Sequence, residues 1–179
     1  QGNIINTENS LDLTIDGPGF FQVLTPGGQI AYTRSGNLTR NAQGQVVTAN
    51  GYPLEPAITI PQNATSISVS KDGIVSVGVP GSNKLDQVGQ IEIATFPNVS
   101  GLKPMGESLA MATPSSGDAI IAAPGTNGAG KIIQGALESS NVNVVEELVS
   151  MIETQRAYEV NSKAISAVDG MMKFLTQSV

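Results

Sequence analysis

The last fifth of the chain contains a segment that predicts one long helix. From Val144 to Gln177 there is no proline and a single glycine, Gly170. Asn143 stands where an N-cap is expected, and Glu146 follows three residues later in the position of a capping box. At 1.5 Å per residue, a helix of about 34 residues is ~50 Å long. The preceding ~130 residues have an expected diameter of about 36 Å, so they cannot cover this helix along its whole length.

The apolar residues of this segment change sides along the predicted helix. From Ala157 onward they fill an arc of about 200° when residues are placed 100° apart, whereas a helix lying on one globule usually needs a stripe of ~100°. The apolar residues of the first turns, Val145 to Ile152, point almost opposite to that arc, and the side changes near Arg156. We therefore expect the helix to contact several neighbours in an assembly. The alternative is a single packing partner within the chain and a frayed end.

The positions expected to pack in such an assembly are large and apolar. They are Leu148, Met151, Ile152, Tyr158, Ile165, Val168, Met171, Met172 and Leu175. The methionines suit adaptable packing against more than one partner, because their side chains are flexible and unbranched. Arg156 and Glu159 lie where the side changes and are expected to supply polar contacts between subunits.

The sequence before the helix predicts antiparallel β structure. LDLTID at 11–16 alternates apolar and polar residues like a half-buried strand, and SISVS-KDG-IVSV at 66–77 predicts a hairpin that turns at Asp72-Gly73. Between Leu11 and Phe96 turn signals recur every ~8–12 residues, which is typical of a sandwich or barrel. Residues 97–140 are rich in Gly, Pro, Ser and Ala and predict a loop-like passage with short extended pieces. The predicted fold class is therefore α+β, mainly β, with one long C-terminal helix.

Composition argues against several classes of function. The net charge is −6, and nine Lys and Arg are scattered among fifteen Asp and Glu, so no basic stripe is available for nucleic acid. The absence of cysteine and histidine removes disulfides, thiolate metal sites, the commonest metal ligand and the usual acid–base group. No apolar run approaches the ~20 residues of a membrane span, and no signal segment is recognisable at Gln1.

Two aspartates are the nearest approach to a catalytic pair. Asp12 and Asp16 fall on the same face of a predicted strand, ~13 Å apart by the strand rise, which is too far for paired-carboxylate hydrolysis. We expect both to be solvated residues of a sheet face. The prediction is a protein that is not an enzyme and that uses no cofactor, metal or small-molecule substrate.

A glycine-rich stretch at 125–131, GTNGAGK, invites comparison with a phosphate-binding loop. Gly125, Gly130 and Lys131 match the first seven positions of G-x-x-x-x-G-K-[ST]. The next residue is Ile132 instead of the Mg²⁺-binding Ser or Thr, and Gly135 interrupts the helix that should follow. We interpret the stretch as a connector with a solvated lysine, and a nucleotide hydrolase remains a minor alternative.

Two long patterns resemble a known family. SLDLTIDGPGFFQVLTPGGQIAYTRSGNLTRNAQGQVVTANGYPL, residues 10–54, resembles the strand-rich segment shared by bacterial flagellar axial proteins of the rod and hook. Residues 124–179, which include SNVN, EELV and QRAYEVNSKA, resemble their C-terminal module. The segment between the two patterns is short, without the inserted outer domain of hook proteins, and VGQIEIATFPNVSGLKPMGESLAMATPSSG at 88–117 is similar to the version in the distal rod.

The resemblance implies a structural subunit of the flagellar basal-body rod, at its distal end. Such subunits assemble into a helical tube that transmits motor torque to the hook. The implied partners are further copies of the chain, the adjacent proximal rod and hook proteins, and the ring bushings around the rod. The implied location is the periplasm, reached through the flagellar secretion system without a cleaved signal. A proximal rod subunit or a short hook protein is the alternative within the family, and a surface adhesin with a helical stalk is the alternative outside it.

The resemblance also gives the expected domains. We expect a β-rich outer domain over 1–96, extended by strands to about 123, a connector over 124–142 and a polymerisation helix over 143–179. Four glycines are expected to let the connector bend between the outer domain and the inner helical layer: Gly125, Gly128, Gly130 and Gly135. The family has an N-terminal helix that pairs with the C-terminal one, and this helix is missing here, so we expect the sequence to be a fragment.

Overall fold

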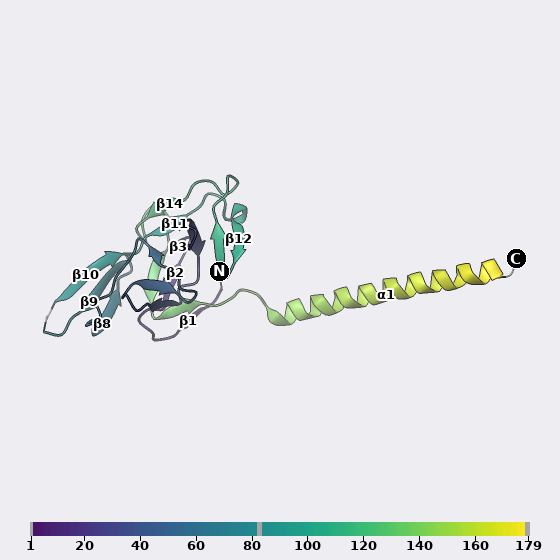
Figure 1. Ribbon diagram of the computed structural model, residues 1–179, viewed down its shortest axis with the longest axis horizontal. Coiled ribbons are helices and arrows are strands. Elements are labelled where there is room, and N and C mark those ends of the chain that lie inside the picture. The colour runs from purple at the N-terminus through teal and green to yellow at the C-terminus, as the bar shows by residue number, and fades with distance from the viewer. Residues whose placement is uncertain (1, 82–83, 178–179) are drawn as a thin grey trace. The chain divides into compact units, whose positions relative to one another are not determined.

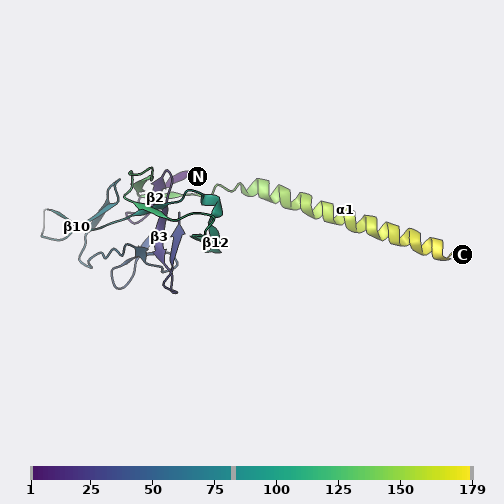
Figure 2. The same ribbon diagram turned by 90° about the horizontal axis from the view of Figure 1, so that it is seen from above.

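The computed structural model describes residues 2–81 and 84–177, with only the backbone described for 174–177. The chain divides into two compact units, Gln1–Ser139 and Ser140–Val179. The first unit is built from short β-strands, and the second contains the helix α1, Val144–Gln177 (Figure 1). A view turned by 90° shows the same uninterrupted helix (Figure 2).

A seven-stranded sheet forms the centre of the first unit, and its strand pairs are all antiparallel. Its strand order is β12 (Lys103–Gly106), β13 (Leu109–Met111), β4 (Ile30–Thr33), β3 (Phe20–Leu24), β11 (Ile93–Thr95) and β14 (Ile120–Ala122), and β7 (Leu54–Glu55) pairs with β3 off this path. Strands that are neighbours in the sheet are often far apart in the sequence. The sheet can therefore form only when segments from several distant parts of the sequence come together.

Smaller antiparallel sheets complete the unit. Three strands pair in the order β10 (Leu85–Gln90), β9 (Ile74–Gly78) and β8 (Ser66–Val69). Three further pairs are β1 (Ile4–Asn6) with β16 (Ala136–Glu138), β2 (Leu13–Asp16) with β15 (Lys131–Gln134), and β5 (Leu38–Arg40) with β6 (Val46–Thr48). A short 3₁₀ helix, η1, spans Val99–Gly101. The predicted hairpin at 66–77 is confirmed as β8 and β9, with Gly73 at φ +81° in its turn.

Aliphatic side chains from several of these sheets share one main core. Its buried members are Leu13, Ile15, Phe21, Leu38, Val46, Leu54, Ile58, Ile60, Val75, Val77, Ile91, Ile93, Ala122, Ala129 and Ile132. Phe20, next to Phe21 in β3, packs instead on a second cluster, because successive residues of a strand point to opposite faces. In that cluster the ring of Phe96 meets Tyr32 edge-on at a centroid distance of 4.7 Å. The predicted class, α+β and mainly antiparallel β, is confirmed, and the described strands form no closed barrel.

The strand β2 is more deeply buried than its pattern predicts. Leu13, Thr14 and Ile15 are all buried, so both faces of the strand are covered. Asp12 was expected to be solvated, and this prediction is wrong. Its carboxylate is buried and accepts hydrogen bonds from Thr7 Oγ1 at 2.6 Å and Asn9 Nδ2 at 3.0 Å. These two donors offset the cost of removing the carboxylate from water. Asp16 is exposed, as predicted.

Five short strands, β12 to β16, lie within the passage 97–140. The first three agree with the short extended pieces expected up to about residue 123, whereas β15 and β16 lie where a connector was expected. Each has only three or four residues, too few for a readable alternation. Most of them pair with strands from the first third of the chain: β13 with β4, β15 with β2, and β16 with β1. These strands are fixed by distant partners and not by their own sequence pattern.

The side chain of Gln134 joins two of the sheets. Its Oε1 accepts from the Val69 backbone N–H at 3.1 Å, and its Nε2 donates to the carbonyls of Ile67 at 3.0 Å and Ser10 at 2.8 Å. Val69 and Ile67 belong to β8, whereas Gln134 belongs to β15. The amide group thus satisfies backbone groups at the edge of β8 as a neighbouring strand would.

Replacing Gln134 with alanine should lower the free energy of unfolding by about 2 kcal/mol, because it leaves one N–H and two carbonyls without their partner. Denaturant unfolding of the purified chain measures this loss. Gln62→Ala serves as the control, since that exposed amide makes one long hydrogen bond, 3.5 Å to the Ala42 carbonyl, and its loss should cost less than about 0.5 kcal/mol. Equal stability of the two variants would contradict the bridging role.

Candidate assembly surface

The helix α1 begins at Val144, where the sequence predicts, and is helical as far as Gln177, the last described residue. Asn143 acts as its N-cap, with Oδ1 accepting from the Val145 N–H at 3.2 Å, while the Glu147 N–H donates to the Asn143 carbonyl at 3.1 Å. Glu146 and Glu147 lie in the first turn, where negative charge interacts favourably with the helix dipole. These local interactions define the start of the helix without contributions from the first unit.

The predicted packing positions of α1 are all exposed where the structure describes their side chains. Their exposed fractions range from 49% at Ile152 to 77% at Tyr158. The others in this set are Leu148, Met151, Ile165, Val168, Met171 and Met172. Arg156 and Glu159 are exposed as well, and the side chain of Leu175 lies outside the described residues. So many large apolar side chains on one helix form an extended surface of the kind that marks a protein–protein contact.

Two hydroxyl groups on α1 are satisfied within the helix. Thr154 Oγ1 donates to the Ser150 carbonyl, and Ser166 Oγ donates to the Ser162 carbonyl, both at 2.9 Å. A hydroxyl that already has a partner can be covered by a neighbouring molecule at little cost. These polar residues therefore do not prevent a close contact along the helix.

The four glycines of the predicted connector lie inside the first unit. Gly125 and Gly128 have φ of +78° in the turn between β14 and β15, and the Gly125 N–H donates to the Gly130 carbonyl at 2.9 Å. A Cβ on Gly130 would lie 2.7 Å from the Asp16 carbonyl oxygen, so its backbone packs directly against β2. Gly135, at φ +76°, turns the chain between β15 and β16. These positions need glycine for turns and close packing within the β structure.

The segment between the β structure and α1 is consequently shorter than the predicted connector at 124–142. The strands β15 and β16 both lie within that range, and the boundary between the two units follows Ser139. Lys131, the lysine of the phosphate-loop comparison, lies in β15 with Asp16 as its register partner, and no helix follows it directly. The phosphate-binding geometry is therefore not formed at this turn.

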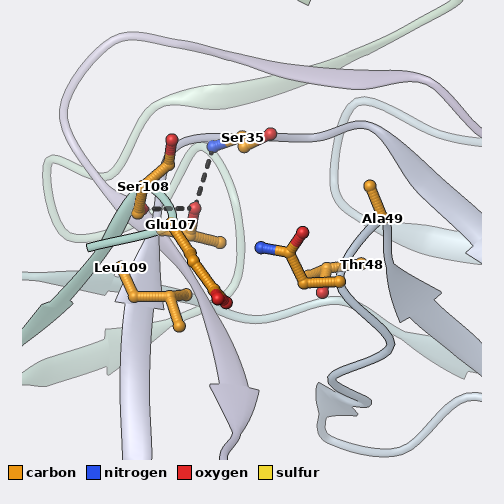
Figure 3. A pocket seen from close by; sticks show the side chains of 8 residues that line it. Ser35, Thr48, Ala49, Glu107, Ser108 and Leu109 are labelled. Carbon is orange, nitrogen blue, oxygen red and sulfur yellow. Dashed lines mark hydrogen bonds between the residues drawn. The ribbon is translucent and has the colours of Figure 1, made fainter. Parts of the chain in front are cut away.

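The first unit has a polar hollow beside the β12–β13 hairpin, with a volume of ≈ 260 Å³ (Figure 3). Thr33, Ser35, Thr48, Ala49, Asn50, Glu107, Ser108 and Leu109 line it. The dashed bonds run from Thr33 Oγ1 to the Ser108 carbonyl at 2.9 Å and from the Ser35 N–H to Thr33 Oγ1 at 3.1 Å (Figure 3). The hydroxyl groups of Thr33 and Thr48 are hydrogen-bonded to backbone groups, and the Glu107 carboxylate accepts from the Tyr52 hydroxyl outside the lining.

Glu107 lies at the tip of this hairpin. Glu107 and Ser108 adopt left-handed φ angles of +53° and +61°, which non-glycine residues seldom do. The Glu107 carboxylate accepts a hydrogen bond from the Tyr52 hydroxyl at 3.0 Å, and this bond, together with the negative charge, raises the pKa of Tyr52. Within the described residues no three His, Cys, Asp or Glu side chains gather closely enough to hold a metal ion. In the described part of the chain, no helix combines the length and apolarity needed to cross a membrane.

Sequence comparisons identify the family of this chain. The family described as "Flagellar hook protein FlgE/F/G D1 domain" matches residues 14–77, which run from β2 to β9. The family described as "Flagellar basal body rod FlgEFG protein C-terminal" matches residues 133–178, which include α1. The first match lies within the first unit, and the second runs from the end of the first unit into the second.

Several curated relatives match almost the whole chain. The flagellar basal-body rod protein FlgG of Buchnera aphidicola subsp. Schizaphis graminum is 50% identical over 177 residues, which are 99% of this chain and 68% of the relative. FlgG of Caulobacter vibrioides is 48% identical over 99% of this chain and 68% of the relative. FlgG of Bacillus subtilis is 40% identical over 95% of this chain and 66% of the relative. The resemblance stated from the sequence is confirmed: the chain belongs to the flagellar rod and hook protein family.

Proposed function

We propose that this chain is a structural subunit of the bacterial flagellar basal-body rod, in its distal part. Relatives of this identity and coverage carry the name of basal-body rod protein, and two flagellar family models match this chain. The single observation that most supports a polymer-forming role is the exposure of the large apolar residues of α1. The protein acts mechanically and is not an enzyme.

The size of the exposed surface favours more than one partner for α1. Between Val142 and Met172, thirteen large apolar residues are exposed, each with roughly half or more of its surface in water. Burying the exposed area of about ten such side chains in a contact would contribute on the order of 10 kcal/mol to the free energy of association. Association itself costs about 4–15 kcal/mol, so one neighbour along a single stripe gives a marginal complex. Contacts on both sides, as the change of side near Arg156 requires, would give a stable polymer.

The roles of the two units follow from this proposal. The β-rich unit would form an outer layer and α1 an inner layer of a helical tube that carries torque. The residues expected in the inner contacts remain those proposed from the sequence, from Leu148 to Leu175. The adjoining partners would be proximal rod and hook proteins and the rings around the rod, in the periplasm, after export through the flagellar secretion system without a cleaved signal.

Deletion of the gene tests the assignment. Basal bodies isolated from the deletion strain should end within the rod and carry no hook in electron micrographs. The complete gene should restore the structure, and the same gene without the codons for residues 144–177 should not. Complete rods and hooks in the deletion strain would refute the proposed function, and recovery of the protein from the outer surface of wild-type cells would favour the adhesin.

A further inference from the structure

One arginine of the first unit uses all its hydrogen-bonding capacity. Arg34 follows β4, and its guanidinium makes five hydrogen bonds. Nε and Nη2 donate to Glu138 Oε2 at 2.9 and 2.7 Å, Nη1 donates to the carbonyls of Gly17 and Gly19 at 2.8 Å each, and Nη2 donates to the Ile15 carbonyl at 3.0 Å. A guanidinium has five N–H groups, so each one is matched to an acceptor.

Glu138, the ionic partner of Arg34, extends the network to the start of the described chain. Its second oxygen, Oε1, accepts from the Gly2 backbone N–H at 3.1 Å. One residue further on, the Ser139 N–H donates to the Asn3 carbonyl at 2.8 Å. The Arg34 network therefore holds together three separate segments: residues 2–6, residues 15–19 and the strand β16.

The network lies at the place where the first unit ends. Glu138 is the last residue of β16, and the boundary between the two units follows the next residue, Ser139. The strand β16 itself is short, with three register pairs to β1. The side chains of Arg34 and Glu138 are only 23% and 16% exposed, so water competes weakly for their charged hydrogen bonds.

We propose that the Arg34–Glu138 network is a mechanical anchor that keeps β16 attached when tension arrives through the segment leading to α1. Without this network, a strand of three residues that pairs, among the described strands, only with β1 would separate from the unit by breaking its backbone hydrogen bonds one after another. Arg34 opposes this stepwise separation at the end of β16. Before Glu138 can move away, its two hydrogen bonds from Arg34 and the one from the Gly2 N–H must all break. Arg34 is thus a positioning residue for the last strand of the unit.

The planar fork of arginine is necessary for this arrangement. A lysine at position 34 keeps the positive charge but carries one nitrogen, which cannot reach Glu138 and the carbonyls of Ile15, Gly17 and Gly19 together. Arg34→Lys therefore removes the coupling between segments without removing the charge. Arg40 supplies a matched control, since it is exposed and makes a single long hydrogen bond, 3.4 Å to the Pro61 carbonyl.

The absence of cysteine in the chain allows a direct force measurement. Cysteines introduced at Ser140 and Gln62 serve as attachment points for pulling through β16. A second pair at Gln43 and Asp72 directs the force through parts of the unit outside β1 and β16. At a fixed force in the first geometry, β16 of the Arg34→Lys variant should detach and the unit unfold at least tenfold faster than in the wild type. In the second geometry the variant should unfold less than twofold faster. Arg40→Lys should match the wild type in both geometries.

Two results would overturn the proposal. Equal acceleration in both pulling geometries would make Arg34 a general stabiliser of the fold, and unchanged rates in the first geometry would remove any role in anchoring. If Arg34→Lys does not fold, Glu138→Gln, which keeps an amide oxygen but loses the charge, is measured in the same way and judged by the same two results. The relevance of tension rests on the proposed rod function. The force measurement uses the isolated full chain, so the anchor and the rod assignment can fail separately.

Discussion

Replacing Gly36 with alanine should strongly destabilise the β-rich unit. A Cβ at this position would lie 1.6 Å from the Leu13 carbonyl oxygen and 2.7 Å from its carbonyl carbon. The Leu13 N–H also donates to the Gly36 carbonyl at 3.0 Å, so the two backbones are joined by a hydrogen bond at the point of the clash. Leu13 is buried in β2 and paired with Gln134, so it has little freedom to move away. The expected loss exceeds about 3 kcal/mol, a large part of the ~5–15 kcal/mol that stabilises an ordinary domain.

Circular dichroism and denaturant unfolding of the purified variant check this prediction. Gly27→Ala is the matched control, because the nearest heavy atom to its new Cβ is Thr25 Oγ1 at 4.0 Å. That change should alter stability by less than about 0.5 kcal/mol. A Gly36→Ala protein that stays folded within about 1 kcal/mol of the wild type would show that β2 can shift, which would contradict the close packing described here.

Replacing Tyr158 with aspartate should abolish incorporation of the chain into the rod while leaving the β-rich unit intact. Tyr158 lies in α1 with its side chain 77% exposed, so its replacement changes no residue of the β core. In a polymer that covers this position, a carboxylate without a partner would lose its water at a cost of several kcal/mol. Rod assembly would therefore fail at the contact and not in the fold.

Motility, basal-body micrographs and the unfolding curve of the purified variant together test this expectation. Ser166→Asp is the control: it introduces the same charge on the polar side of α1, where Lys163 lies one turn away. Cells with Ser166→Asp should swim, and cells with Tyr158→Asp should not. Normal motility of the Tyr158→Asp strain would refute the proposed assembly surface. A changed unfolding curve would show that the substitution acts on the stability of the fold instead of on assembly.

The sequence predicts α1 correctly because the signals that define a helix are local. The cap at Asn143, the absence of proline and the apolar period all lie within the segment that they describe. The hairpin of β8 and β9 is predicted for the same reason, since its turn at Gly73 lies between the two strands. The contacts made by α1 in an assembly are not tested by the isolated chain and stay predictions.

The errors fall where a residue depends on a distant partner. Asp12 is the exception, because its partners Thr7 and Asn9 are only five and three residues away but lie before the alternating pattern at 11–16. The strand β15 carries no alternation of its own and exists through its pairing with β2, more than a hundred residues earlier. No pattern within either segment could have joined Arg34 to Glu138, which are separated by 104 positions. The glycines from Gly125 to Gly135 are predicted to let a connector bend, whereas in the structure they form turns and close contacts within the β structure.

The pairing of the first strand with the last one also affects how the chain can fold as it becomes available from its N-terminus. Ile4 needs Glu138 as its partner, and Ile132, only 1% exposed, fills the core beside Ile15. A chain that has emerged only as far as residue 120 lacks β15 and β16 and leaves that part of the core open to water. Folding dominated by such long-range contacts is slow. A chain exported through the flagellar secretion system, as proposed here, can complete the core of its β-rich unit only after residues 131–138 have arrived.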